Sequence, residues 1–167
     1  MISTKEIYEI CKKYNILNYT INPDGSIDVS GGVYLSYRKL DRLPLKFNRV
    51  LGQFDCSYNE LTSLEGCPKY VGGSFFCSGN KITTLEGGPD IVNLNYFSNF
   101  NVLLISTKGF PSIVSNDVSI RFCHKLTSLE DYNLSYEKLD IDNKVKIIRK
   151  VKLDKLIREL WNQTSIK

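Results

Sequence analysis

Cysteine and histidine have the greatest capacity for chemistry in this chain, which holds five cysteines and one histidine. Cys123 and His124 are adjacent, whereas a Cys–His nucleophile needs its two side chains within hydrogen-bonding distance. Neighbouring residues on a strand point to opposite faces, so this pair does not predict catalysis. The sequence also shows no paired carboxylates and no phosphate-binding loop. We therefore expect neither an enzyme nor a cofactor.

The spacing of the cysteines differs from that of a metal site. A structural zinc ion takes four Cys or His ligands, commonly in closely spaced pairs, and the sequence contains no Cys-x-x-Cys. We expect no metal, and interpret the cysteines as free, mostly buried thiols in a reducing compartment. They are Cys11, Cys56, Cys67, Cys77 and Cys123.

Recognition by aromatic side chains is a second kind of chemistry, indicated by residues that recur every 21 positions. Two of these columns are rich in Tyr and Phe, and a third is polar. We expect all three to point to solvent on the concave face of a sheet, where clustered aromatics with few charges are typical of an interface. The predicted partner-binding residues are Tyr34, Tyr37, Gln53, Asp55, Tyr58, Ser74, Phe76, Asn95, Phe97 and Phe100.

Two other interpretations of these rings remain open. A register shifted by one residue would place them in the core, because side chains alternate between the two faces of a strand. A C-terminal helix folded back over the sheet would cover them.

The element that positions these residues is a repeat marked by Asn59, Asn80 and Asn101. Arg38 stands at the asparagine position of a first, degraded unit, and we expect His124 to do so in the last. One unit cannot bury its apolar face alone, so we predict five stacked rungs with one short strand each. The asparagine amides should bond the backbone of adjacent turns. The inward columns are Phe54, Phe75 and Tyr96; Cys56, Cys77 and Ser98; Leu61, Ile82 and Leu103; and Val50, Val71 and Val92.

The motif "FDCSYNELTSLEG" at residues 54–66, repeated as "FFCSGNKITTLEG", resembles the short-unit leucine-rich repeats of bacterial effector proteins. It is more similar still to repeats in a group of small tailed-phage proteins. The resemblance covers roughly residues 24–130, and it brings no catalytic residues with it. The expected fold is an α+β repeat solenoid of about five leucine-rich-repeat rungs of 21–23 residues, spanning residues 32–131.

Solenoid ends need caps, and the sequence predicts one at each end. In residues 1–31, Ser3 and Glu6 form a capping box for a helix through about Tyr14. A β-hairpin around Pro23-Asp24-Gly25 should follow and pair with the first rung. Residues 132–167 are expected to form a basic helical cap, with the helix from about Asp142 to Trp161.

Charge divides between these parts of the chain. Residues 1–131 carry equal numbers of basic and acidic side chains, so the formal net charge of +4 lies in residues 132–167. A plain capping helix is the favoured interpretation, with partner docking, self-association or phosphate contacts to nucleic acid as alternatives. The nucleic-acid alternative would use Lys144, Lys146, Arg149, Lys150, Lys152, Lys155 and Arg158.

The function that the sequence favours is protein binding through the aromatic residues. No membrane span is expected, since no apolar run is long enough, and an N-terminus without a signal-peptide pattern predicts a cytoplasmic location. The phage resemblance implies a factor that binds and inhibits or redirects a host protein, such as a defence component. The alternatives are nucleic-acid binding by the tail, or a small ligand such as a nucleotide held against Phe76 and Phe97.

Overall fold

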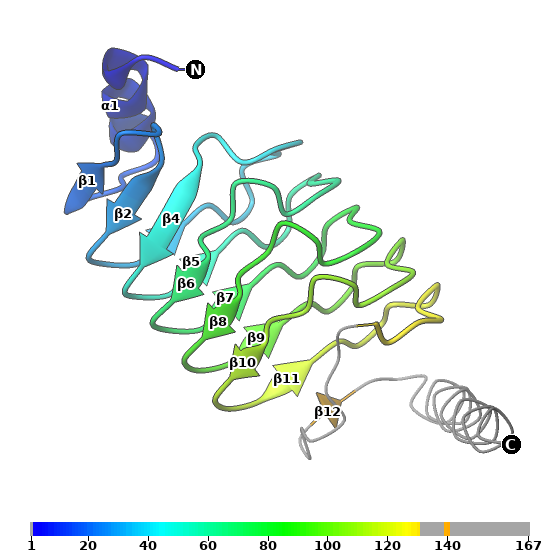
Figure 1. Cartoon of the computed structure of the whole chain (residues 1–167). Coiled ribbons are helices and arrows are strands. Elements are labelled where there is room, and N and C mark those ends of the chain that lie inside the picture. The colour runs from blue at the N-terminus through cyan, green and yellow to red at the C-terminus, as the bar shows by residue number, and fades with distance from the viewer. Residues whose placement is uncertain (1, 131–138, 141–167) are drawn as a thin grey trace, which may run out of the picture.

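The computed structural model describes residues 2–130 and 139–140, in which the chain winds as a solenoid of short strands (Figure 1). It begins with helix α1 (Thr4–Lys13) and a hairpin of β1 (Tyr19–Ile21) and β2 (Ile27–Val29). The strands that follow are β3 (Val33–Tyr34), β4 (Phe47–Val50), β5 (Phe54–Asp55), β6 (Tyr70–Val71), β7 (Phe75–Phe76), β8 (Ile91–Val92), β9 (Tyr96–Phe97), β10 (Ile113–Val114), β11 (Val118–Ser119) and β12 (Leu139–Asp140).

The strands form two sheets that run the length of the solenoid. The first sheet has the order β1-β2-β4-β6-β8-β10 and the second β12-β11-β9-β7-β5-β3. Only the β1–β2 hairpin is antiparallel, and each other neighbouring pair of described strands is parallel. Phe54 pairs with Phe75, and Phe75 with Tyr96, so the 21-residue period is the strand register itself.

Each unit contributes two strands, so the expectation of one strand per unit was wrong. Val50 ends β4 and Phe54 begins β5, with a corner of three residues between them. Both residues are fully buried, as are Val71 and Phe75 one turn later. The valine column thus belongs to the first sheet and the column of Phe54 and Phe75 to the second. Two-residue strands are too short to show an alternating pattern of their own, which is why periodicity does not reveal them.

The core is a set of columns that run along the solenoid axis. The rings of Phe54 and Phe75 stack at 5.8 Å between centroids, and those of Phe75 and Tyr96 at 5.3 Å. Burying each such ring stabilises the fold by about 2 kcal/mol. Leu104, not Leu103, continues the column of Leu61 and Ile82, because the fourth unit carries one extra residue after its asparagine.

The predicted asparagine ladder is confirmed. The Nδ2 atom of Asn80 donates to the carbonyl oxygens of Cys56 (3.1 Å) and Cys77 (3.0 Å), and Oδ1 accepts from the backbone N–H of Leu61 (3.1 Å). Asn59 and Asn101 make equivalent bonds one turn away on either side. The carbonyl oxygens of Cys56 and Cys77 each accept from two successive asparagines, so the amides satisfy the buried backbone and hold successive turns together.

The last unit departs from the expectation for His124. Cys123 occupies the asparagine position, 22 residues after Asn101, and its Sγ donates to the carbonyl oxygen of Ser98 at 3.3 Å. Cys123 is buried, whereas His124 is exposed. The extra residue of the fourth unit shifts the last unit by one position, and this places the thiol rather than the imidazole in the ladder.

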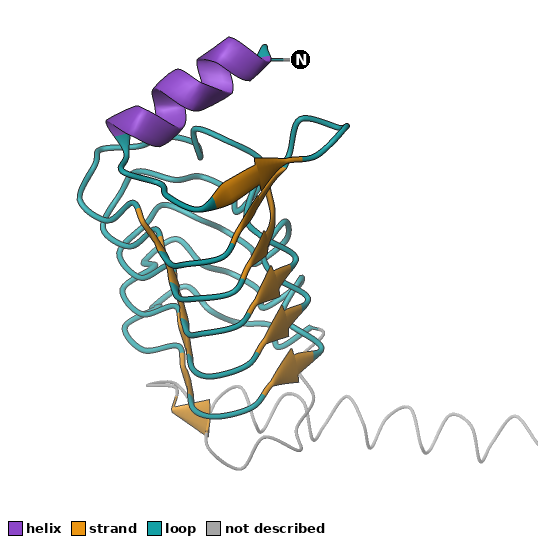
Figure 2. Ribbon diagram, turned by 90° about the vertical axis from the view of Figure 1, so that its left-hand side faces the viewer, coloured by secondary structure: helices purple, strands orange, loops and turns teal. Residues whose placement is uncertain are grey.

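The N-terminal cap forms as predicted. Ser3 and Glu6 make a reciprocal capping box, Tyr14 ends the helix, and Ile7 and Cys11 are buried. The hairpin pairs through β2 with β4. Figure 2 shows α1 lying across the first turns of the stack, where it covers the end of the core.

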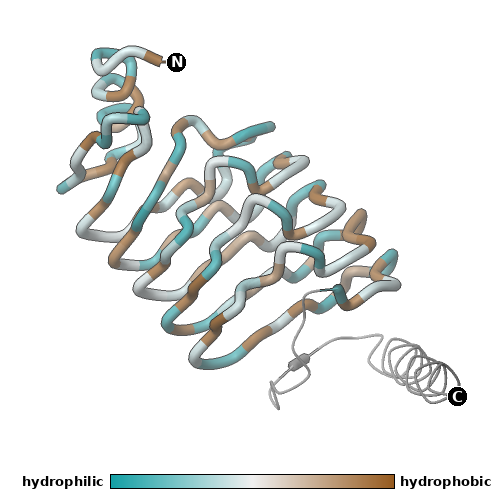
Figure 3. Tube along the Cα trace, viewed as in Figure 1, coloured by the Kyte–Doolittle hydropathy of each residue, from teal (hydrophilic) through white to brown (hydrophobic). Residues whose placement is uncertain are grey.

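The described residues therefore form a repeat solenoid of strands with one short helix. Hydrophobic and hydrophilic segments recur from turn to turn along the tube in Figure 3. After the cap hairpin, the strands from β3 to β11 make about four turns, one fewer than the five rungs expected. The predicted C-terminal helical cap lies outside the described residues, as do the basic side chains at positions 144–158.

Candidate binding surface

The outer surface of the second sheet carries the predicted aromatic residues. We call it the aromatic face and define it by the outward columns that begin at Tyr34 and Tyr37. Tyr34 is 59% exposed and Tyr37 71%, while Phe76 and Phe97 are half-buried on the same surface. The prediction that these columns point outward is confirmed, since their neighbours Phe75 and Tyr96 fill the core. The face comprises Tyr34, Tyr37, Asp55, Tyr58, Phe76, Phe97, Phe100 and Phe122.

The second column of this face has an unusual backbone. Tyr37, Tyr58, Phe100 and Phe122 have φ between 53° and 58°, and Gly79, the remaining member, has φ 67°. The left-handed conformation costs a residue with a side chain about 1–2 kcal/mol, and glycine almost nothing. The repeat imposes this conformation on every turn. It does not require a large ring there, as Gly79 demonstrates.

The rings of this column form two stacked pairs. Tyr37 and Tyr58 lie 4.7 Å apart between centroids with planes 10° from parallel, and Phe100 and Phe122 lie 4.5 Å apart at 11°. A Cβ atom added at Gly79 would come within 2.6 Å of Cδ1 of Tyr58. Each stacked pair returns about 0.5–1.5 kcal/mol, which offsets only part of the backbone strain of its two residues.

A hollow of about 310 Å³ runs between the two aromatic columns. Tyr37 and Tyr58 form one wall, and the other holds Phe76 and Phe97, which stack at 5.1 Å. The floor is polar and made of Ser36, Ser57, Ser78 and Asn99. We call this hollow the aromatic groove.

Asp55 completes the wall of the aromatic groove and is its one carboxylate. Its Oδ1 accepts the backbone N–H of Ser57 at 2.9 Å. Within the described part of the chain, no basic side chain forms an ion pair with Asp55. The groove therefore combines apolar ring faces, hydroxyl groups and one negative charge with which none of the described basic side chains forms an ion pair.

The polar column of the prediction lies elsewhere. Gln53 and Asn95 are half-buried at the corner between the two sheets, and Ser74 is only 7% exposed. Ser74 Oγ accepts hydrogen bonds from the backbone N–H and Nδ2 of Asn95, both at 3.3 Å. The expectation that Ser74 faces solvent was wrong, because its hydroxyl bonds to the next turn within the corner.

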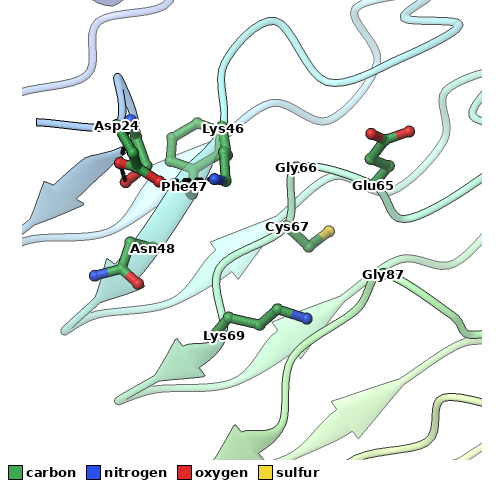
Figure 4. Close-up of a pocket in the computed structure, with 10 residues that line it drawn as sticks. Asp24, Lys46, Phe47, Asn48, Glu65, Gly66, Cys67, Lys69 and Gly87 are labelled. Carbon is green, nitrogen blue, oxygen red and sulfur yellow. Dashed lines mark hydrogen bonds and ion pairs between the residues drawn. The ribbon is translucent and has the colours of Figure 1, made fainter. Parts of the chain in front are cut away.

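A second hollow, of about 330 Å³, lies on the other side of the solenoid near the hairpin (Figure 4). Its two lysines form ion pairs, with Lys46 Nζ 2.7 Å from Asp24 Oδ2 and Lys69 3.9 Å from Asp90, whereas Glu65 forms no ion pair with a described residue. The hydrogen bond from Lys46, with others from Ser26, lowers the pKa of the Asp24 carboxyl.

The cysteines behave as expected in the described residues. All five are free and buried. Burial raises the pKa of the Cys77 thiol, and a hydrogen bond with Cys67 raises that of Cys56. The described residues contain no cluster that could hold a metal ion. They also contain no helix long and apolar enough to span a bilayer.

Sequence reasoning missed one residue of the face, Phe122. It follows Phe100 by 22 positions rather than 21, so a strict 21-residue frame passes over it.

Fold and surface together define a capped repeat solenoid that presents an aromatic face. The chain matches no known family model, no curated protein and no solved structure.

Proposed function

We propose that this protein is a binding module that holds another protein against its aromatic face. The observation that carries the proposal is the column of four large rings at positions where the backbone favours glycine. Three of them, Tyr37, Tyr58 and Phe100, are 44–71% exposed. Folding alone does not account for placing exposed rings on strained backbone, and strain that persists in a fold is commonly tied to function. Rings whose faces are open to solvent gain most from burial by a partner.

The finer assignment rests on the resemblance of the repeat. On that basis the solenoid is a variant of the leucine-rich repeat, and the protein is a phage-encoded factor acting in the bacterial cytoplasm. Its partner would be a host protein, for example a defence component that it inhibits or redirects. The aromatic face supports binding, and the resemblance alone supports the kind of partner.

The test is affinity capture from a bacterial lysate, followed by purification of the captured protein and titration of the pure pair. The Tyr58→Ser/Phe100→Ser variant removes two rings, one 44% and the other 45% exposed. The matched control is Leu51→Ser/Ile113→Ser, whose side chains are 47% and 48% exposed outside the aromatic face. Truncating exposed anchor rings should weaken binding at least about thirtyfold, while the control pair should bind as wild type does.

Two results would overturn the proposal. The first is that the Tyr58→Ser/Phe100→Ser variant and the control variant bind the captured protein equally well. The second is that wild type captures no protein that the Tyr58→Ser/Phe100→Ser variant fails to capture. The nucleic-acid alternative makes a separate prediction. Binding through lysines and arginines to phosphates weakens steeply as salt rises, whereas burial of apolar rings does not weaken in this way.

A further inference from the structure

The aromatic groove brings ring faces from two successive turns to one carboxylate. Asp55 on β5 and Phe76 on β7 are register partners in the second sheet, and both line the groove. Tyr58 supplies the facing wall. Its ring lies against the next turn, because a Cβ atom added at Gly79 would come within 2.6 Å of its Cδ1. Gly79 therefore leaves the space that the Tyr58 ring occupies on the turn of Phe76.

The polar groups of the groove include acceptors that the described chain leaves unused. Asp55 is half-buried; its Oδ1 accepts the backbone N–H of Ser57 at 2.9 Å, and its Oδ2 accepts no hydrogen bond from a described residue. The hydroxyls of Ser36 and Ser57 in the floor also make no hydrogen bond with a described residue. No basic side chain lines the groove. A half-buried carboxylate attracts a cation more strongly than an exposed one, because less water screens it.

An arginine side chain has the properties that these surroundings favour. Its guanidinium is planar and permanently charged, stacks on aromatic faces, and presents a fork of N–H donors that matches a carboxylate. Donors that do not bond Asp55 can bond the serine hydroxyls of the floor. A lysine ammonium is more strongly hydrated and has no flat face, so it gains less between two rings.

The size and charge of the groove limit what else it could bind. Its volume of about 310 Å³ is at the lower end of the range for ligand pockets, about 300–1,000 Å³, and suits one side chain. A nucleotide would bring a phosphate close to Asp55, and two negative charges repel each other. Charge complementarity thus favours a basic side chain of a protein.

We propose that the aromatic groove binds one arginine side chain of the partner protein, with its guanidinium against the rings of Tyr58 and Phe76 and paired with Asp55. This inference rests on the proposed function, because it names the residue by which the aromatic face recognises its partner.

The experiment uses a displayed library of short randomised peptides selected on the full-length protein. An enriched peptide is then synthesised with arginine, lysine or citrulline at its arginine position, since citrulline has the shape of arginine without the charge. Each peptide is titrated against wild type and three variants, and thermal melts establish that each variant folds.

The three variants separate charge, ring and background. Asp55→Asn keeps the oxygen that accepts from Ser57 and removes the charge, and Phe76→Leu keeps apolar bulk and removes the ring face. Glu65→Gln is the matched control, because it removes an exposed carboxylate that lies outside the aromatic groove and forms no ion pair with a described residue.

We expect the enriched peptides to share an arginine. On wild type and Glu65→Gln, citrulline should weaken binding at least about tenfold and lysine at least about threefold. On Asp55→Asn, the arginine and citrulline peptides should bind within about twofold of each other. Phe76→Leu should weaken the arginine peptide about threefold or more, and the comparison in Asp55→Asn stands even if Phe76→Leu does not fold.

Several outcomes would overturn the inference. They are a selection that enriches no arginine peptide, a citrulline or lysine peptide that binds wild type as well as the arginine peptide does, and a tenfold preference for arginine that persists in Asp55→Asn. A second copy of this chain could also be the occupant of the groove. Dimerisation of wild type that Asp55→Asn abolishes, measured by analytical ultracentrifugation, would show this and overturn the inference too.

Failure of this inference can be told from failure of the proposed function with the captured protein. If Tyr58→Ser/Phe100→Ser loses that protein while Asp55→Asn and Phe76→Leu retain it, the aromatic face binds and the groove takes no arginine. If all three variants retain it, both proposals fall.

Discussion

Cys123 stands where Asn101 stands one turn earlier, and its thiol donates to the carbonyl oxygen of Ser98 at 3.3 Å. Asn101 makes the corresponding bond to Cys77 O through Nδ2 at 3.2 Å, and also bonds the Ser98 carbonyl and hydroxyl. A thiol is a weak donor, whereas an amide offers two donors and an acceptor. The ladder therefore weakens at its last described turn.

Replacing Cys123 with asparagine should strengthen this turn. The Cys123→Asn variant should raise the free energy of unfolding by about 0.5–1.5 kcal/mol, the usual net gain of a hydrogen bond. Urea denaturation of wild type, Cys123→Asn and Cys123→Ala measures it. An asparagine variant no more stable than the alanine variant would show that the position lacks ladder geometry.

Asn80, at the centre of the ladder, should be far less tolerant of substitution. Asn80→Ala leaves the N–H of Leu61 without its acceptor and removes one of the two amide donors to each of the carbonyls of Cys56 and Cys77, which still accept from Asn59 and Asn101. We expect a loss of about 1–3 kcal/mol in the free energy of unfolding. Asn93→Ala is the control, because its exposed Nδ2 makes one bond, to Tyr70 Oη at 2.7 Å. Chemical denaturation that shows equal losses would contradict a structural role for the ladder.

The sequence predicts the period, the inward columns and the N-terminal cap because each follows from local chemistry. The ladder asparagine recurs at Asn59, Asn80 and Asn101 because each buried turn needs the same amide to bond its backbone. The N-terminal helix is predictable because Ser3 and Glu6 form a local capping signal. The β4-β6-β8-β10 part of the first sheet escapes prediction because its strands span two to four residues. Ser74 is placed wrongly because sequence alone does not show the corner that shelters its hydroxyl.

The aromatic face is predictable in position but not in geometry. Alternation places Phe76 outward once Phe75 is taken as core. The positive φ of Tyr37 and Phe100 cannot be inferred from residue types, since large aromatic side chains are disfavoured there. Gly79 in the same column is the single sequence clue, and it becomes informative only once the column is known to be left-handed.

The buried thiols make the fold sensitive to alkaline pH. Burial raises the pKa of Cys77 in the folded state, so folding favours its protonated form. The resulting stability is full below the unfolded pKa, about 8.5, and is lost as pH rises above it. We expect the free energy of unfolding to be flat from about pH 6 to 8 and to fall above about pH 8.5. Urea titrations across this range should show a shallower alkaline decline in Cys77→Ser, and an unchanged slope would contradict the assignment.

An opposite dependence applies to Asp24 at acid pH. The hydrogen bond from Lys46 lowers the pKa of this carboxyl in the folded state. Its contribution is present above the unfolded pKa, about 3.9, and is lost as pH falls through that value toward the folded pKa. Asp24→Asn should therefore show a smaller drop in the urea midpoint than wild type between about pH 5 and 2. Parallel curves for the two proteins would show that the ion pair makes no difference to folding.

Tyr37 and Tyr34 allow the strain of the aromatic face to be separated from its packing. Tyr37 is in the left-handed region with φ 58°, and Tyr34 is extended in β3. Tyr37→Gly loses one stack but relieves about 1–2 kcal/mol of strain, so its free energy of unfolding should stay within about 1 kcal/mol of wild type. Tyr34→Gly relieves nothing and adds backbone freedom to a strand, so it should cost about 1 kcal/mol or more. Thermal and urea unfolding would measure both variants beside a titration of the captured partner. Preserved stability with weakened binding in Tyr37→Gly would show that the ring is kept for recognition, whereas a larger loss of stability than in Tyr34→Gly would assign the ring to the fold.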